Sequence, residues 1–424
     1  MLATGAVDRL KRRSRPVKGP LSLAFDSVNA FLQFYFTKFE SPGFLRVSAA
    51  RLVGEDPVSG GSNRLFWVRK PRFTPVSPCL TPPGYSAGMS SKALISADSP
   101  RVAIIVPAYG VAHLLAEALD SVLAQTESAW ECIVVDDGAP DDVAGAVAPY
   151  LADPRIRFLQ TDNGGVATAR NRAIASATAP YITLLDGDDR LWPEYLAQIL
   201  PVIAADDSIR IATCNAVMFG ALPQEQLCFD APQPPGDLAA VLDRSFGVYI
   251  GSTFRRADWE RIGGFDPSLR HCEDFDFWVR LLQLGGAAEY VDAVLGDYRV
   301  RAGSASGDCG SMLIGNLKVY EKARAALPAN APEQPLIAEL IAETHEALAF
   351  EHAIDRVVEG DTRRGLAELA SLRRLVNGPL WTWSFVLWRV CPALARPMLR
   401  WRRRQHSRGF QRKGLRSLFE ISPA

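Results

Sequence analysis

The sequence predicts an α/β protein whose main domain is built on a mostly parallel, Rossmann-like β-sheet flanked by helices. From residue 101 onward, short apolar runs alternate with segments of helical periodicity, a pattern typical of strand–helix–strand units. The apolar runs contain no alternating polar residues, which indicates strands buried on both faces of the sheet. The chain has 424 residues, 48% of them hydrophobic, so it can bury a large core.

The predicted elements of the first half follow one another without a break. Residues 102–106 form a short apolar run, and the apolar residues between Val111 and Leu123 recur at helical spacing, so we expect a strand followed by a helix. The same alternation predicts strands at 132–135, 156–159 and 181–185, and helices at 143–151 and 166–175.

The second half is less regular. Its apolar runs predict strands at 211–219, 248–254 and 289–294, with a helix near 275–284. From 312 to 375 the pattern is helical throughout, and Gly360-Asp361 separates two amphipathic stretches at 337–358 and 362–375. We therefore expect a helical hairpin after the α/β domain.

These patterns divide the chain into five parts. We expect a partly helical N-terminal segment at 1–53, a Pro/Gly/Ser-rich linker or wrapping segment at 54–100, the α/β domain at 101–306, a helical hairpin region at 307–376 and an amphipathic, basic, membrane-associating tail at 377–424.

We expect neither a signal peptide nor a transmembrane helix. Asp26, Asn29 and Gln33 interrupt the N-terminal apolar run at 21–36, and no uncharged apolar window reaches the length of about 18 residues that a spanning helix needs. The seven cysteines lie far apart, without a CxxC pair or zinc-ligand spacing, so we expect free thiols in a reducing compartment.

Carboxylates follow two of the predicted strands at the point where each strand ends. Asp136-Asp137-Gly138 comes directly after 132–135, and residues 186–189 (Asp-Gly-Asp-Asp) come after 181–185. Ligands of parallel sheets bind beyond the carboxyl ends of the strands, so a nucleotide fits the first group. The second group is crowded with like charge and needs a cation. Mg²⁺ or Mn²⁺ beside a diphosphate satisfies this need, because such an ion takes one or two carboxylates and completes its shell with water and phosphate.

A third polar segment lies between these two. Residues 163–171 (Asn-Gly-Gly-Val-Ala-Thr-Ala-Arg-Asn) combine glycines that permit close backbone approach with Arg170, one turn inside the predicted helix. This arrangement favours an anionic ligand nearby. The chain has no GxxxxGK[ST] phosphate loop, so a P-loop nucleotide site is excluded.

Taken in order, these motifs resemble those of the family 2 glycosyltransferases, which have the GT-A fold. Residues 106–110 (Val-Pro-Ala-Tyr-Gly) resemble VPxYN, 136–138 resemble the nucleotide-reading DDG, and 163–171 resemble NxGxxxARN. Asp186-Gly187-Asp188 resembles the DxD metal motif, and Glu273-Asp274 resembles the late ED motif that supplies the catalytic base. The matches span roughly 101–306, and their order and strand-end placement are more specific than any single motif.

The resemblance implies a role for each matching residue. It makes Asp136 a partner of the base or ribose, Asp186 a ribose or sugar contact, and Asp188 the metal ligand, with Asp186 as a second metal ligand. The further donor contacts that we expect are Pro107, Tyr109, Asp137, Gly138, Asn163, Gly165 and Arg170, with Arg299 and Arg301 closing over the diphosphate.

Only one of Glu273 and Asp274 can be the base, because adjacent helical residues diverge by about 100°. By similarity to the family, in which the aspartate of the pair meets the acceptor, we expect Asp274 to act and keep Glu273 in reserve. Inversion needs one base that deprotonates the acceptor hydroxyl, while the metal stabilises the departing nucleoside diphosphate.

Three residues depart from the family pattern. Gly110 replaces an asparagine, Ala139 replaces a capping serine, and Arg301 stands where many relatives place a histidine near the phosphates. These departures leave the core carboxylates intact and weaken only the inference about phosphate contacts.

Structural interpretations stand beside the functional ones. Asp136-Asp137 can serve as a helix N-cap, Asp189 fits better as the lead-in to a helix that begins near Pro193, and Glu273-Asp274 can be first-turn acidic residues favoured by the helix dipole. We assign no function to the isolated His113 and His271.

The C-terminal sequence predicts contact with a membrane surface. From 389 to 416 there are ten basic residues and no acidic ones, so the other 396 residues carry a formal net charge of −10. Four tryptophans lie between 381 and 401, but Arg389 and Arg396 interrupt the apolar stretch. Placing either arginine at mid-bilayer would cost about 2.5–3.5 kcal/mol, so we expect an interfacial anchor on anionic lipid. Nucleic acid binding and a solvated tail are the competing interpretations.

These features predict inverting transfer of a sugar from a nucleotide diphosphate donor, expected to be a UDP-sugar, to a saccharide or lipid-linked acceptor in cell-surface polysaccharide synthesis. We expect a cytoplasmic enzyme, peripheral on the inner face of the plasma membrane, without a nucleic acid partner. One alternative is a metal-dependent nucleotidyltransferase, which needs a Gly-rich, Lys-containing loop that 106–111 lacks. The other is a catalytically silent nucleotide-sugar-binding or scaffold protein that uses the helices after Met312.

Overall fold

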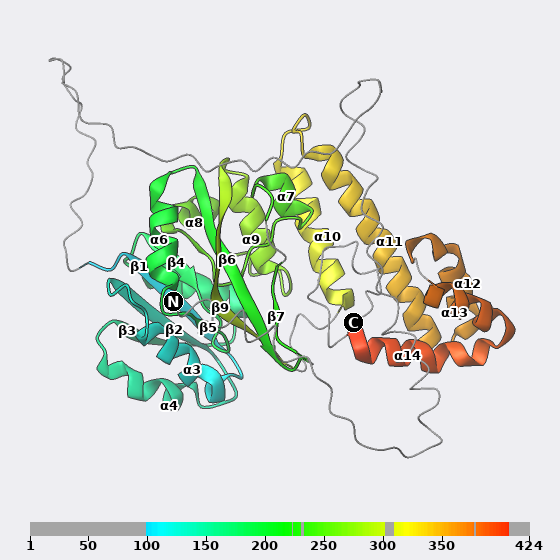
Figure 1. Cartoon of the computed structure of the whole chain (residues 1–424), viewed down its shortest axis with the longest axis horizontal. Helices are drawn as coiled ribbons and strands as arrows, with labels where there is room; N and C mark the ends of the chain where they lie inside the picture. Colours follow the sequence, from blue (N-terminus) through cyan, green and yellow to red (C-terminus); the bar gives the residue numbers. More distant parts are fainter. Residues whose placement is uncertain (1–98, 223, 230–232, 302–308, 377–378, 407–424) are drawn as a thin grey trace, which may run out of the picture. The chain divides into compact units, whose positions relative to one another are not determined.

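The computed structural model describes residues 99–222, 224–229, 233–301, 309–376 and 379–406 (Figure 1). The predicted N-terminal segment 1–53, the predicted linker 54–100 except its last two residues, and the final part of the predicted tail, 407–424, lie outside the described residues.

The described part is built around a nine-stranded mixed sheet with the order β3-β2-β1-β4-β8-β6-β9-β5, in which β7 pairs with β6 (Figure 1). The strands are β1 (Val102–Ala108), β2 (Trp130–Asp137), β3 (Ile156–Thr161), β4 (Tyr181–Leu184), β5 (Arg190–Leu191), β6 (Ile209–Gly220), β7 (Gln226–Leu227), β8 (Thr253–Arg255) and β9 (Ala287–Val300). The first four are parallel to one another, as predicted, whereas β8 runs antiparallel to both β4 and β6.

The predicted strand at 248–254 is wrong in its first part, because only Thr253–Arg255 forms a strand. Before it, backbone groups bond to side chains in place of a neighbouring strand. Tyr249 N donates to the hydroxyl of Thr213 at 3.1 Å, and the hydroxyl of Ser252 donates to the carbonyl of Tyr249. Apolar content alone does not reveal such side-chain bonding.

Two apolar cores cover the two faces of the sheet, and consecutive strand residues alternate between them. In β1, Ala103 and Ile105 belong to one core, while Ile104 and Val106 belong to the other. This alternation between two buried faces explains why the strands read as unbroken apolar runs.

Helices supply the outer layer of each core. The helices of the α/β region are α3 (Ala112–Leu123), α4 (Val143–Val147), α5 (Val166–Ser176), α6 (Tyr195–Ala205), α7 (Leu238–Leu242), α8 (Arg256–Ile262) and α9 (Glu273–Leu282). Side chains of α3, α4 and α6 pack on one face, and those of α5, α7 and α9 on the other. The predicted helix at 143–151 ends early as α4, because a 3₁₀ turn with Pro149 in its first positions follows from 148.

The chain continues into helices α10 (Cys309–Ala326), α11 (Gln334–Glu359), α12 (Thr362–Ser371), α13 (Pro379–Val390) and α14 (Ala395–His406). Apolar residues of α10, such as Leu313 and Tyr320, belong to the same core as α5 and α9. Lys322 of α10 also pairs with Asp266 and Asp276 at 2.5 and 2.7 Å. The first of these helices is therefore an integral part of the α/β core.

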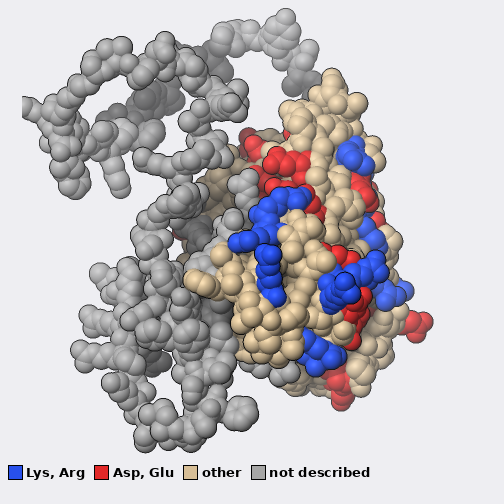
Figure 2. Space-filling model, turned by 90° about the vertical axis from the view of Figure 1, so that its right-hand side faces the viewer, with Lys and Arg blue, Asp and Glu red and all other residues tan. Residues whose placement is uncertain are grey.

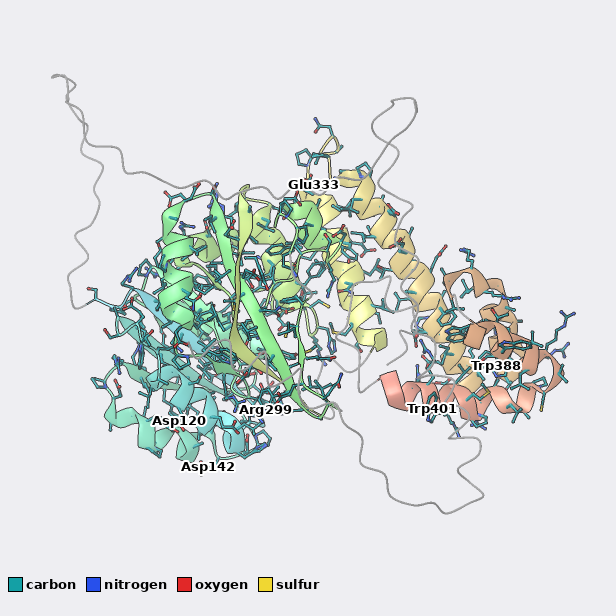
Figure 3. All side chains as sticks on the ribbon, in the orientation of Figure 1. Asp120, Asp142, Arg299, Glu333, Trp388 and Trp401 are labelled. Atoms are coloured by element: carbon teal, nitrogen blue, oxygen red, sulfur yellow. The ribbon has the colours of Figure 1, made fainter. Side chains whose placement is uncertain are left out.

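A third core joins α11 to the last helices. Phe350 of α11 packs against Trp381 of α13, and Trp388 and Leu399 belong to the same cluster. Trp388 and Trp401 lie in these C-terminal helices (Figure 3). Trp381 and Trp388 are buried, so part of the aromatic stretch that the sequence assigned to a membrane surface forms a protein core.

Within the described residues, no helix combines the length and apolar character needed to cross a bilayer. The five cysteines whose side chains are described, Cys132, Cys214, Cys228, Cys272 and Cys391, are free thiols, as expected.

Candidate active site

Parallel pairing brings the predicted strand-end residues to one edge of the sheet. Ala108 of β1 lies opposite Asp136 of β2, and Ile105 of β1 lies opposite Leu184 of β4. The residues that follow β1, β2 and β4 therefore emerge beside one another.

Asp136 and Asp137 are the last residues of β2, and both are buried. The carboxylate of Asp136 accepts hydrogen bonds from Ala139 N at 2.8 Å and from Gln160 Nε2 at 3.2 Å. Neither residue caps a helix, because α4 is capped by Asp142, which accepts from Gly145 N at 2.8 Å (Figure 3). The N-cap interpretation of the aspartate pair is therefore wrong.

Asp137 binds the loop that precedes α5. Its two carboxylate oxygens accept from Gly164 N and Gly165 N, each at 2.8 Å. Gly138 has a φ of +63°, and a Cβ at this position would lie 2.6 Å from Asn163 N. The structure thus brings the predicted residues Asp137, Gly138, Asn163 and Gly165 together and gives Asp137 a loop-holding contact.

The turn after β1 contains Pro107, Tyr109 and Gly110. Tyr109 is 54% exposed, and Gly187 packs against Pro107, since a Cβ on Gly187 would lie 3.1 Å from the Pro107 carbonyl oxygen. Gly110 has a φ of +67°, a left-handed conformation open to glycine and tolerated by asparagine, which accounts for the exchange between these two residues.

Sequence reasoning missed Asp141, whose carboxylate accepts from Gly110 N at 3.0 Å and from Ala112 N at 2.7 Å. It satisfies Ala112 N, the first backbone donor of α3, whose own N-cap residue, Val111, makes no side-chain cap bond. The residues are 29 and 31 positions apart, and no local pattern links them.

Arg170 of α5 is a deeply buried charged side chain at this edge, with 2% exposure. Its guanidinium pairs with Asp186 Oδ1 at 2.7 Å and Glu273 Oε1 at 2.9 Å. Burial lowers the pKa of Arg170, but the carboxylates of Asp186 and Glu273 outweigh this effect and raise it. The sequence predicted an anionic ligand near the positive charge of Arg170. In the structure this charge is instead paired with the carboxylates of Asp186 and Glu273.

The turn at 186–189 carries the predicted metal ligands. The carboxylate of Asp186 is partly exposed, and that of Asp188 is 14% exposed and pairs with Arg301 Nε at 2.5 Å. Burial and the neighbouring Asp186 raise the pKa of Asp188, against the effect of Arg301. Asp186 and Asp188 of the turn are thus each paired with an arginine, Arg170 and Arg301 respectively.

These residues suit a divalent cation. Among the described side chains, no group of three or more acidic, histidine or cysteine residues is arranged as a complete metal site. Asp186 and Asp188 together offer the one or two carboxylates that Mg²⁺ or Mn²⁺ takes when phosphate and water complete its shell.

Asp189 is buried and has a structural role, which the sequence also favoured. Its partner differs from the one expected. It accepts from Arg299 N at 2.7 Å, which ties the turn to β9, whereas the sequence assigned it to the start of the following helix. Burial and the adjacent Asp186 and Asp188 raise its pKa.

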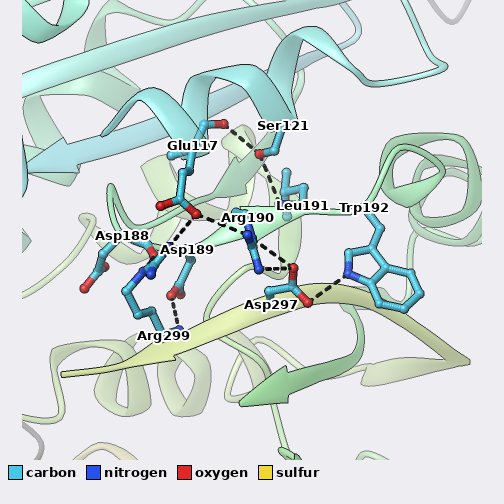
Figure 4. Close-up of polar contacts among 10 residues, drawn as sticks. Glu117, Ser121, Asp188, Asp189, Arg190, Leu191, Trp192, Asp297 and Arg299 are labelled. Carbon is cyan, nitrogen blue, oxygen red and sulfur yellow. Dashed lines mark hydrogen bonds and ion pairs between the residues drawn. The ribbon is translucent and has the colours of Figure 1, made fainter. Parts of the chain in front are cut away.

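Arg299 contacts Glu117, Asp188 and Asp189 (Figure 4). Its Nε donates to the carbonyl of Asp188 at 2.8 Å, and its other guanidinium nitrogen pairs with Glu117 of α3 at 2.7 Å. Arg190 pairs with the same Glu117 at 3.1 Å, and both arginines lie over the Phe219 ring. Here Arg299 supports the metal-motif turn, and Glu117 and Arg190 are partners that sequence reasoning missed.

Glu273 and Asp274 open α9 directly after Cys272, which has a φ of +61°. Glu273 is turned toward Arg170, while Asp274 Oδ1 accepts from Phe275 N at 2.7 Å. Burial and the neighbouring Asp274 raise the pKa of Glu273 to about 7, against the effect of Arg170. The two acidic side chains therefore have different partners.

Sequence comparison places this domain among known proteins. Residues 103–220 match the family model Glycosyl transferase family 2. An uncharacterized glycosyltransferase of Bacillus subtilis, EpsJ, is 47% identical over 212 residues, which are 47% of this chain and 61% of EpsJ. The uncharacterized glycosyltransferase YibD of Escherichia coli is 33% identical over 166 residues, 38% of this chain and 44% of YibD. The chain thus covers less than two thirds of the length of these relatives.

A third relative is the putative teichuronic acid biosynthesis glycosyltransferase TuaG of Bacillus subtilis, 27% identical over 47% of this chain and 79% of TuaG. Among solved structures, residues 1–349 of S. aureus TarS in complex with UDP-GlcNAc superpose with a TM-score of 0.51 and 18% identity, over 75% of this chain and 90% of that one. At 18% identity this similarity establishes the fold alone, which is GT-A. By its motifs, its sheet and the match at 103–220, the α/β domain of this chain is a family 2 glycosyltransferase domain.

Proposed function

We propose that the chain is an inverting glycosyltransferase that moves a sugar from a UDP-sugar to a hydroxyl of a saccharide or lipid-linked acceptor in cell-surface polysaccharide synthesis. The observation that carries this proposal is the ion-paired chain Asp186–Arg170–Glu273, with distances of 2.7 and 2.9 Å. It joins the DxD motif to the ED motif, as a reaction between a bound donor and an activated acceptor requires. The UDP-GlcNAc of the TarS complex and the teichuronic acid of the TuaG name support this substrate class.

On the donor side, we assign the nucleoside to the edge formed by Tyr109, Asp136 and the loop at 163–165. Tyr109 is exposed and offers a ring for the base to stack on. Asp136 lies at the end of β2 beside the loop that Asp137 holds. We assign Asp186 to the ribose or sugar.

We assign Mn²⁺ or Mg²⁺ to Asp188 and Asp186, beside the diphosphate. When bound, the ion would stabilise negative charge on the departing nucleoside diphosphate. Arg301 pairs with Asp188, and we assign it to the same phosphates. Arg299 contributes by holding the Asp188 backbone.

We assign the base to Asp274. Glu273 is engaged by the buried Arg170, whereas Asp274 Oδ1 accepts only from its neighbour Phe275 N among the hydrogen bonds of the described residues. Asp274 would take the proton of the acceptor hydroxyl as that oxygen bonds to the anomeric carbon. The bond from the anomeric carbon to the diphosphate breaks from the opposite face, and its electron pair leaves with UDP.

Calorimetry with UDP-, GDP- and dTDP-sugars, with and without Mn²⁺, tests the donor site. We expect one donor to bind in a metal-dependent way and Asp188→Ala to lose that binding, while Asp142→Ala, whose carboxylate caps α4, retains it. Absence of binding to any of these donors would contradict the proposal and favour a scaffold role.

We further propose that the protein works at the inner, cytoplasmic face of a membrane, on anionic lipid. One side of α13 and the turn after it carries exposed apolar residues at helical spacing, namely Trp383, Val386, Leu387, Val390 and Leu394. Trp383 and Val390 are 62% and 81% exposed. The side of the molecule that lies to the right in Figure 1 shows lysine and arginine side chains interspersed with acidic ones on a largely uncharged surface (Figure 2).

Charge favours lipid as the occupant of this face. Arg389, Arg400 and Arg403 are exposed, and α13 and α14 contain no acidic residue. Apolar side chains flanked by arginine suit the interface of an anionic bilayer. We expect flotation with vesicles that contain phosphatidylglycerol but not with pure phosphatidylcholine. Trp383→Ser/Val390→Ser should abolish it, and Leu151→Ser, a change at an exposed leucine elsewhere, should not. Retained flotation of the double variant, or dimerisation through this face, would refute the assignment.

A further inference from the structure

Arg170 lies where three parts of the domain meet. It belongs to α5, its first partner Asp186 follows β4, and its second partner Glu273 begins α9. The Phe265 ring, in the segment before α9, lies 5.5 Å from the guanidinium carbon. Asp186 and Glu273 are 16 and 103 positions from Arg170 along the sequence. The Arg170 side chain therefore joins segments that are remote in the chain.

A buried charge is retained only where its partners compensate the loss of water. Two carboxylates face Arg170 directly, and Asp274 adds a third negative charge nearby. The planar guanidinium can bond two carboxylates at a fixed angle, whereas a lysine ammonium acts as a point charge without that geometry. Arg170 is therefore suited to fixing the relative position of its two partners.

The next residue supports the same junction independently. Asn171 Nδ2 donates to the Phe265 carbonyl at 2.8 Å, and Asn171 Oδ1 accepts from Phe265 N at 2.8 Å and from Trp259 Nε1 at 3.1 Å. The side-chain amide thus holds both backbone groups of one residue in the segment that leads to α9. Consecutive residues of α5 position the segment before α9 and the first residue of α9.

We propose that Arg170 is a positioning residue that fixes Asp186, on the donor side, relative to the Glu273-Asp274 turn, on the acceptor side, and is not a ligand of the donor phosphates. This inference rests on the proposed glycosyl transfer. Misplacing reacting groups by about 1 Å can lower the rate by about 100-fold, so loss of this geometry should affect the chemical step more than donor binding.

The kinetic test compares Arg170→Lys and Arg170→Met with Arg172→Met on the donor that the wild type turns over, with release of UDP or another nucleoside diphosphate as the readout. Arg172 is an exposed arginine on the same helix that donates to the Asp162 carbonyl, and its variant should keep wild-type kinetics. For Arg170→Lys we expect kcat to fall by about 100-fold with the donor KM within about threefold. A raised KM with unchanged kcat would identify a phosphate ligand, and an unchanged kcat per folded molecule would identify a purely structural residue. Either result overturns the proposal.

A second test needs no turnover. Hydrogen exchange of the amides at 273–276 is compared for Asp186→Asn in the wild-type and Arg170→Met backgrounds, or in Arg170→Lys if the methionine variant does not fold. We expect Asp186→Asn to speed this exchange about tenfold, which corresponds to about 1.4 kcal/mol in the opening equilibrium, and to have no such effect once Arg170 is replaced. An equal effect in both backgrounds refutes the connection through Arg170. The hydrogen-exchange experiment tests the positioning role of Arg170 even if no donor reacts. A failure of every donor to react would count against the proposed function and not against this role.

Discussion

Removal of the Asp137 carboxylate should loosen the loop before α5 and destabilise the domain. Asp137 is 3% exposed, and its two oxygens accept from Gly164 N and Gly165 N at 2.8 Å each. A hydrogen bond to a charged group contributes about 1.5–3 kcal/mol. Because both glycines are exposed, their N–H groups can turn to water, so the lower end of this range applies.

We therefore expect Asp137→Ala to cost about 3 kcal/mol. Asp137→Asn keeps one acceptor oxygen and should cost about half of this. The control is Asp142→Ala, which removes one exposed N-cap bond from the short α4 and should cost about 1 kcal/mol.

Urea unfolding measures these differences as shifts of the midpoint at constant slope. Donor binding should weaken from wild type to Asp137→Asn to Asp137→Ala, because the loop at 163–165 lies at the proposed nucleoside edge, whereas Asp142→Ala should keep it. If Asp137→Ala lost donor binding while its stability stayed at the wild-type value, the carboxylate would contact the donor and the loop-holding role would be refuted.

Three further predictions address the same domain. Gly138→Ala should destabilise far more than Gly165→Ala, because both glycines have a positive φ but only Gly138 would bring a Cβ to 2.6 Å from a backbone nitrogen; equal midpoints in urea would contradict this. The pKa of Glu273 is raised from 4.5 to about 7, so the folded protein holds this proton more tightly than the unfolded chain, and stability should fall as pH rises from about 4.5 to about 7. Glu273→Gln should remove that part of the pH dependence of stability. Identical stability profiles of wild type and Glu273→Gln across this pH range would contradict the raised pKa of Glu273. Lys322→Met leaves the buried Asp276 with Arg280 as its remaining cation and should cost about 1.5–3 kcal/mol, whereas an unchanged urea midpoint would show that the Lys322 ion pairs do not stabilise the attachment of α10.

Local patterns were sufficient to predict the first half of the sheet and the strand-end carboxylates. The runs at 102–106 and 132–135 are buried on both faces, so their apolar continuity reports their environment directly. Asp136 lies in the last residues of β2 and Asp186 comes two residues after the end of β4, and parallel pairing then brings them to a common edge. Such features depend on neighbours in the chain and are visible in the sequence.

Pairings between distant residues were not predictable in this way. The charge of Arg170 indicated an anion, but the structure supplies two carboxylates from 16 and 103 residues away. Arg299 meets Glu117 across 182 residues. No periodicity encodes such partners, because they depend on how the whole sheet and its helices pack.

The C-terminal tryptophans illustrate the same limit. Trp381 and Trp383 are two residues apart and alike in composition, yet the first is buried against Phe350 and the second is exposed. Sequence hydropathy cannot separate them, since the distinction depends on the position of α11. The exposed face of α13 can therefore be identified only once the structure shows which side of the helix packs against α11.

The most direct test of the central claim is acceptor-dependent release of nucleoside diphosphate by the purified 424-residue chain. UDP-, GDP- and dTDP-sugars are supplied with Mn²⁺ and a lipid-linked saccharide extract, and wild type is compared with Asp274→Asn and Glu273→Gln. We predict release from one donor in the wild type, a loss of at least about 100-fold in Asp274→Asn, as expected for removal of a general base, and a smaller loss in Glu273→Gln. Wild-type rates in Asp274→Asn would contradict the assignment of the base, and no release from any donor would contradict glycosyl transfer itself.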